Sequence, residues 1–135
     1  MKKYLVDTSA LLRYILKDIP SQSGVVAEVF RQAKNGQSEL TMPLAVFFEA
    51  TYVLTAVYKF GRQAVKTQCE KFLMIPYLDI PERAALRGGY EIWVTHASIS
   101  FADAVLFHMA KLGEKELFTL DKKLKHLAED GKITP

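Results

Sequence analysis

The sequence predicts an α/β fold, a three-layer α/β/α sandwich in which helices cover both faces of a largely parallel central sheet. Two observations carry this prediction. Four short apolar runs alternate with longer segments of helical periodicity, and no repeat, linker or low-complexity segment divides the chain. Right-handed crossovers between such strands make them parallel. With 135 residues, 50% of them hydrophobic and 24% charged, residues 1–135 are predicted to form one domain.

The first half of the chain is predicted to contain two strands and four helices. Asp7 ends the first apolar run, and Thr8 or Ser9 can cap the helix that follows. Pro43 fits a first helical turn, where it needs no amide partner. The predicted elements are a strand at 3–6, a helix carrying Leu11, Leu12, Ile15 and Leu16, a helix ending at Asn35-Gly36, a strand at 39–42, a helix from Pro43 to Gly61 and a helix from Arg62 to about Met74.

The second half is predicted to contain two more strands, each followed by helical segments. Ser100 is a candidate N-cap for the helix after it, and Gly113 closes that helix. The predicted elements are a strand at 77–80, a helical segment opened by Pro81-Glu82 and interrupted by Gly88-Gly89, a helix at 101–112, a strand at 117–120 and a short basic helix at 122–129. The sequence offers no reason for the paired glycines.

Composition excludes several classes of protein. One cysteine, Cys69, allows neither an internal disulfide nor a zinc knuckle, and its apolar neighbours indicate a core position. The apolar run at the N-terminus stops at Asp7 without a cleavage site, and no apolar stretch approaches the length of a membrane span. We therefore expect a soluble, cytoplasmic protein. The net charge of +3 permits a polyanionic partner without requiring one.

Four acidic residues stand out by position. Asp7 and Asp121 directly follow predicted strands, and ligands of open α/β sheets bind beyond the carboxyl ends of the strands. Glu49 and Asp103 lie in unusually apolar stretches, where a carboxylate needs a donor or a cation beside it. Each also has a simpler explanation. Asp7, Asp103 and Asp121 could be helix caps and Glu49 a solvated helix position, and for any one acid alone we favour that explanation.

The combination of the four acids changes this balance, because unrelated caps would not gather at one sheet edge. Clustered carboxylates repel one another unless a cation neutralises them, and ligation by oxygen alone suits Mg²⁺ or Mn²⁺. Such ions usually act on phosphates, so hydrolysis of a phosphodiester is the predicted chemistry. The three histidines show no metal-ligand spacing.

The four acids lie in a recognisable set of motifs: Leu5-Val6-Asp7-Thr8-Ser9-Ala10-Leu11-Leu12, Glu49 within a helix, Phe101-Ala102-Asp103-Ala104, and Thr119-Leu120-Asp121-Lys122-Lys123-Leu124. By these motifs the sequence resembles the PIN-domain nucleases. The chain is most similar to the toxin half of VapBC toxin–antitoxin modules, which are single domains of similar length. The last two motifs in this order are fairly specific, whereas Asp-Thr-Ser after a strand is weak alone.

The resemblance implies particular roles. Asp7, Glu49, Asp103 and Asp121 would bind Mg²⁺ or Mn²⁺ as the catalytic residues of an endoribonuclease. Ser9 and Thr119 would hold those carboxylates by hydrogen bonds. A cognate antitoxin and a homodimer are implied as well. The target could be a tRNA, a ribosomal RNA or a messenger RNA.

Cationic residues near these acids are candidates for contacts with RNA phosphates. They are Arg13 on the first helix, and Lys122 and Lys123 after the last acid. Ordinary solvated lysines explain the same pattern equally well.

Other readings remain open at this point. A phosphoaspartyl phosphatase also has an acid after its first strand, but Ser9 stands where such enzymes have a second aspartate. A metal-dependent DNase and a scaffold that has lost catalysis are further alternatives.

Overall fold

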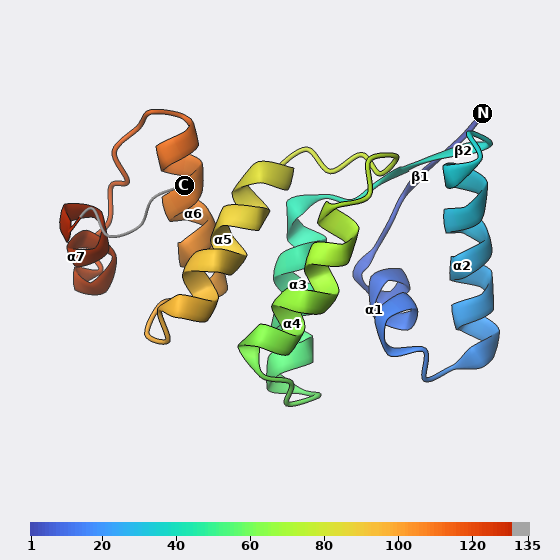
Figure 1. Cartoon of the computed structure of the whole chain (residues 1–135), viewed down its shortest axis with the longest axis horizontal. Helices are drawn as coiled ribbons and strands as arrows, with labels where there is room; N and C mark the ends of the chain where they lie inside the picture. The colour runs from blue at the N-terminus through green and yellow to red at the C-terminus, as the bar shows by residue number, and fades with distance from the viewer. Residues whose placement is uncertain (131–135) are drawn as a thin grey trace. The chain divides into compact units, whose positions relative to one another are not determined.

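The computed structural model describes residues 1–130, which form two compact units, Met1–Glu82 (unit 1) and the segment from Arg83 onward (unit 2). In Figure 1, unit 1 contains the strands and the first four helices, and unit 2 contains the remaining described helices. No helix within residues 1–130 is both long enough and apolar enough to cross a membrane.

The sheet of unit 1 consists of two parallel strands. β1 (Lys2–Leu5) pairs with β2 (Ser38–Thr41) along its whole length. Because parallel strands cannot be joined by a tight turn, the chain crosses over through α1 (Thr8–Leu16) and α2 (Pro20–Lys34). The α/β class and the parallel direction predicted from the sequence are confirmed.

A third extended segment contacts β2 at one point only. Thr41 and Asp79 form an isolated parallel bridge. The Asp79 amide donates to the Leu40 carbonyl at 2.9 Å, and the Met42 amide donates to the Asp79 carbonyl at 2.8 Å. The strand predicted at 77–80 is therefore reduced to the pairing of a single residue.

Two further helices, α3 (Leu44–Ala56) and α4 (Arg62–Leu73), complete unit 1. Pro43 occupies the cap position directly before α3, as its fixed φ favours. The rings of Tyr14 and Phe30 stack with centroids 4.7 Å apart. Cys69 is buried, as predicted. The largest fully buried side chains of the unit are Leu11, Leu40, Met42, Phe47, Leu54, Val65, Cys69 and Leu73.

Unit 2 is helical where it is described, with α5 (Arg83–Thr95), α6 (Phe101–Leu112) and α7 (Lys122–Asp130). The core between α5 and α6 is aromatic, and Tyr90 stacks on Phe101 with ring centroids 4.2 Å apart. Packing against α5 fixes the backbone of α6, which carries Asp103.

The paired glycines lie inside α5, which runs through them without interruption, so the predicted break at this position is wrong. A Cβ added to Gly88 would lie 2.3 Å from the His108 ring, and one added to Gly89 would lie 2.4 Å from Val105 Cγ2. Both neighbours belong to α6. Glycine is needed here because the two helices approach each other too closely for a side chain.

The strand predicted at 117–120 is also wrong, because this segment has irregular backbone. Its apolar residues are not buried. Phe118 is 91% exposed and Leu120 is 82% exposed. A strand needs a partner for its backbone groups, and no strand among residues 1–130 pairs with this segment.

His108 gives unit 2 a pH-dependent stability. Its side chain is buried, and Nδ1 has no hydrogen-bond partner in the part of the chain that the structure describes. Burial, and secondarily the charge of Lys111, lower the pKa of His108 below its ordinary value of 6.5. As the pH falls below that value, the unfolded chain takes up a proton that the folded chain resists, so the folded state loses stability.

We therefore expect the free energy of unfolding to decrease between about pH 7.5 and about pH 5.5, and to decrease less in His108→Leu. Urea unfolding of both proteins at the two pH values measures the difference. An identical pH dependence in the two proteins would show that His108 does not contribute.

Candidate metal centre

Asp7 is held where β1 passes into α1. It is the N-cap of α1, and its Oδ1 accepts hydrogen bonds from the Ala10 amide at 3.0 Å and from Ser9 Oγ at 2.7 Å. The first of these bonds and then the second lower the pKa of Asp7 below its ordinary value of 3.8. Asp7 is therefore ionised at neutral pH. Both of these bonds go to Oδ1, so neither of them occupies Oδ2.

Glu49 lies beside the same helix terminus. It is exposed on α3, and its Oε2 accepts a long hydrogen bond of 3.4 Å from Thr8 Oγ1. Thr8 directly follows Asp7, so unit 1 brings these two acids into one neighbourhood. From the sequence, Thr8 was expected only as a possible helix cap. The Asp-Thr-Ser motif offers two hydroxyls, and only the structure shows that they serve different carboxylates.

Asp103 lies in the first turn of α6. Ser100 caps this helix, and its hydroxyl accepts the Asp103 amide at 3.2 Å. This is half of a capping box. In the other half, the Ser100 amide would donate to the Asp103 carboxylate, and this bond is not formed among the described residues. The carboxylate is therefore not used by the cap.

Asp121 caps α7. Its Oδ1 accepts the amides of Lys123 at 2.8 Å and Leu124 at 3.3 Å. The Thr119 hydroxyl accepts the Asp121 backbone amide at 3.0 Å, which closes a local turn. The bond expected from Thr119 to the Asp121 carboxylate stays a prediction. Asp7 and Asp121 thus each use one oxygen as a cap, which leaves the other oxygen for a ligand.

The candidate cations differ in their surroundings. Arg13 Nη1 forms an ion pair with Asp18 Oδ1 at 2.6 Å, and the Arg13 side chain is only 17% exposed. A hydrogen bond with Tyr58, and after it the ion pair, raise the pKa of Arg13. Arg13 therefore links α1 to the end of α3. By contrast, Lys122 and Lys123 are exposed at the start of α7.

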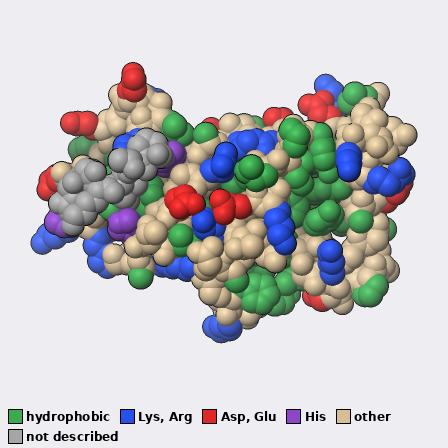
Figure 2. All heavy atoms as spheres, in the orientation of Figure 1, with side chains coloured by type: hydrophobic (Ala, Val, Ile, Leu, Met, Phe, Trp, Pro, Cys, Tyr) green, Lys and Arg blue, Asp and Glu red, His purple; other side chains and the backbone are tan. Residues whose placement is uncertain are grey.

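Lys and Arg side chains do not gather into a single patch on the face shown in Figure 2, where they alternate with acidic and apolar ones. This distribution agrees with the modest net charge of +3. On this face, recognition of a polyanion would therefore depend on a few individual cations rather than on a broad basic surface.

Asp7 and Glu49 lie in unit 1, and Asp103 and Asp121 lie in unit 2. Within the described residues, no three His, Cys, Asp or Glu side chains form a ready-made metal cluster. The donor chemistry nevertheless fits a hard divalent cation, because all four are carboxylates and oxygen ligands suit Mg²⁺ and Mn²⁺.

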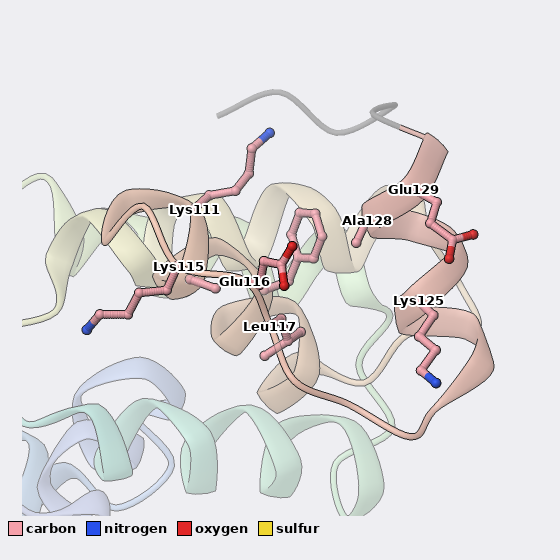
Figure 3. A pocket seen from close by; sticks show the side chains of 9 residues that line it. Lys111, Lys115, Glu116, Leu117, Lys125, Ala128 and Glu129 are labelled. Atoms are coloured by element: carbon pink, nitrogen blue, oxygen red, sulfur yellow. The ribbon is translucent and has the colours of Figure 1, made fainter.

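One hollow in unit 2 does not contain these acids. It has a volume of about 610 Å³ and lies between α6, α7 and the segment joining them (Figure 3). Its lining includes Phe107, Leu117 and Ala128, and among its charged residues are Glu116 and Lys125. Neither Asp103 nor Asp121 lines it, so we place the candidate centre by the acids and not by the size of the cavity.

The family of this protein follows from comparison of its sequence with known families. Residues 4–130 match the PIN domain family, and this match spans both units. The chain belongs to the PIN domain family, which is a family of nuclease-type folds with a mixed α/β architecture. PIN domains are generally metal-dependent nucleases that act on nucleic acids. No significant match is found among curated proteins.

Proposed function

We propose that this protein is a Mg²⁺- or Mn²⁺-dependent endoribonuclease in which Asp7, Glu49, Asp103 and Asp121 bind the metal. The observation that carries the proposal is the environment of Asp7. In a chain of the PIN domain family, this aspartate is held ionised at the end of β1 with one oxygen free, and Thr8 connects it to a second carboxylate. We treat both units as one domain because the family match is continuous from residue 4 to 130.

When bound, the ion supplies a Lewis acid and an activated water for hydrolysis of the phosphodiester. Residues of the chain orient the carboxylates that would bind the ion. Ser9 and the Ala10 amide fix the Asp7 carboxylate and keep it deprotonated, while Thr8 restrains Glu49. The amides at the start of α7 fix Asp121 in the same way. Carboxylates restrained in this manner lose little entropy when they bind a cation.

We assign contacts with RNA phosphates first to Lys122 and Lys123. Both are exposed directly after Asp121, so they can approach a phosphate near that carboxylate. Arg13 is a weaker candidate, since its guanidinium is already paired with Asp18.

We further propose that this is a VapC-type toxin that acts in the cytoplasm, dimerises and binds a cognate antitoxin. The support is the resemblance of its motifs and of its length to that group. Coexpression with the product of an adjacent small gene, followed by co-purification, tests this part separately from catalysis.

The deciding experiment for the nuclease is metal-dependent cleavage. We expect the purified chain to cut a mixed RNA pool in Mg²⁺ or Mn²⁺, to lose this activity in chelator, and to regain it when metal is added back. DNA of matched sequence and a small phosphomonoester are tested in parallel. Cleavage of DNA alone would favour the DNase, and hydrolysis of the monoester alone would favour the phosphatase.

Contamination and a scaffold role give different outcomes. Activity that survives chelation would come from another enzyme or another site. The absence of both cleavage and measurable Mg²⁺ or Mn²⁺ affinity would overturn the proposal in favour of a scaffold.

A further inference from the structure

One face of α3 is unusual for a helix at a protein surface. Glu49 is the only charged residue among the thirteen of α3. The residues opposite its buried side are Ala45, Glu49, Tyr52 and Ala56. The outward face of an amphipathic helix is normally charged or polar. Here it consists of one carboxylate and one aromatic ring between two alanines.

Tyr52 is the large side chain of this face, and 65% of it is exposed. Tyr14 and Tyr90, by comparison, each stack on a phenylalanine. Within residues 1–130 the Tyr52 ring has no stacking partner, and its hydroxyl forms no hydrogen bond. A rigid aromatic surface is thus left uncovered beside a helix whose other side is fully packed.

The position of the Tyr52 ring relative to Glu49 indicates which part of a bound substrate would lie against the ring. Residues three apart on a helix project from the same face, about 5–6 Å apart at Cβ. The ring is therefore a direct neighbour of a proposed metal ligand. A phosphodiester bound at that ligand would carry its adjoining bases within reach of the ring.

We propose that Tyr52 stacks on an unpaired base of the RNA next to the bond that is cut. This inference rests on the proposed function and adds a specificity-determining residue to it. Aromatic rings stack on bases of single strands, whereas the faces of bases within a duplex are already covered by their neighbours. We therefore expect the strand to be unpaired at the cleavage site.

The same face is less suited to a protein partner. Protein interfaces usually rely on a cluster of large apolar side chains around a buried anchor. Along this face Tyr52 lies between Glu49 and Ala56, with Ala45 beyond Glu49, and the two alanines offer little surface to a protein.

The test is a series of substitutions at Tyr52, measured in Mg²⁺ by the Kd for a short single-stranded RNA with non-hydrolysable linkages, so that the metal stays bound and no cleavage occurs. Tyr52→Phe and Tyr52→Trp retain an aromatic face and should bind like the wild type. Tyr52→Leu and Tyr52→Ala should raise the Kd roughly 5- to 150-fold. Leucine is the informative variant, because it is apolar and of similar bulk but has no π face.

An RNA with one abasic position extends the test. Removing the base that stacks on Tyr52 should weaken binding by the same factor as Tyr52→Ala, and combining the two changes should add little. Val57→Ala is the matched control. Val57 is the C-cap of α3, five residues after Tyr52, so it lies on a different side of the helix axis, and at 64% it is as exposed as Tyr52. Its Kd should equal that of the wild type.

The outcomes separate this inference from the proposed function. Wild-type affinity in Tyr52→Leu, with cleavage intact, would overturn the inference alone. Unchanged RNA binding together with loss of self-association in Tyr52→Ala, measured by sedimentation, would show that the face contacts protein and would also overturn it. A wild-type chain that neither binds nor cuts RNA would overturn the inference and the proposed function together.

Discussion

Replacing Asp7 by asparagine should reduce metal-dependent RNA cleavage by more than about 100-fold. Loss of a group that only orients a ligand typically costs 10- to 100-fold, and loss of a ligand charge should exceed this. The change is nearly isosteric, and it removes the charge that the Ala10 amide and Ser9 hydroxyl stabilise. The cleavage rate and the Mn²⁺ affinity, measured by calorimetry, should decrease together.

The helix-capping role of Asp7 provides the control for this experiment. Asparagine caps a helix as well as aspartate does, whereas alanine costs about 1 kcal/mol at such a position. Asp7→Asn should therefore unfold in urea like the wild type, while Asp7→Ala should lose both stability and activity. If Asp7→Asn keeps its activity, Asp7 serves as a cap only and the proposed metal centre is wrong.

The order of the elements could be predicted from the sequence because hydrophobic period and capping residues are local signals. Ser100 is the N-cap of its helix, as predicted. Pro43, expected in a first helical turn, lies one residue earlier as the cap, and Asp7 rather than Thr8 or Ser9 caps α1. The apolar run before Asp7 is a strand in the structure. These features depend on a few adjacent residues, so the sequence contains them.

Structural features that depend on residues far apart in the chain could not be predicted from the sequence. Gly88-Gly89 was interpreted as an interruption, because paired glycines usually break helices. In the structure, the pair instead allows α5 to approach His108 and Val105 of α6. A sequence does not show which helix lies opposite a glycine. The segment 117–120 is an apolar run with one β-branched residue, as buried strands have, but pairing depends on a partner strand as well as on the segment.

The candidate site stays a prediction, in which the four acids stand out by their position after expected strands and within apolar helices. The structure adds how Asp7, Glu49 and Asp121 are restrained, with Thr8 at Glu49 as the unforeseen contact. It also shows that Arg13 is paired with Asp18. Spacing along the chain cannot show whether a cation is already neutralised.

The close approach of α5 and α6 leads to the largest expected effect on stability. In Gly89→Ala, the added Cβ would lie 2.4 Å from Val105 Cγ2 and 3.1 Å from Val105 Cα. The second contact is with backbone, so a change of rotamer cannot relieve it. Overpacking of a core typically costs about 1–3 kcal/mol. The better helix propensity of alanine returns at most about 1 kcal/mol. We expect Gly89→Ala to lower the free energy of unfolding by roughly 1–2 kcal/mol.

Two further variants identify the cause of this loss. Gly24 lies within α2 with nothing within 4 Å of the position of a Cβ. The same substitution there should therefore stabilise the protein by about 0.4–1 kcal/mol.

Val105→Ala removes the nearer of the two contacts. Combined with Gly89→Ala, it should give a smaller loss than the sum of the single losses, by about 0.5–3 kcal/mol. Strict additivity in urea unfolding would show that the two helices do not meet at these residues, and it would remove the packing argument for how α6 and its Asp103 are held.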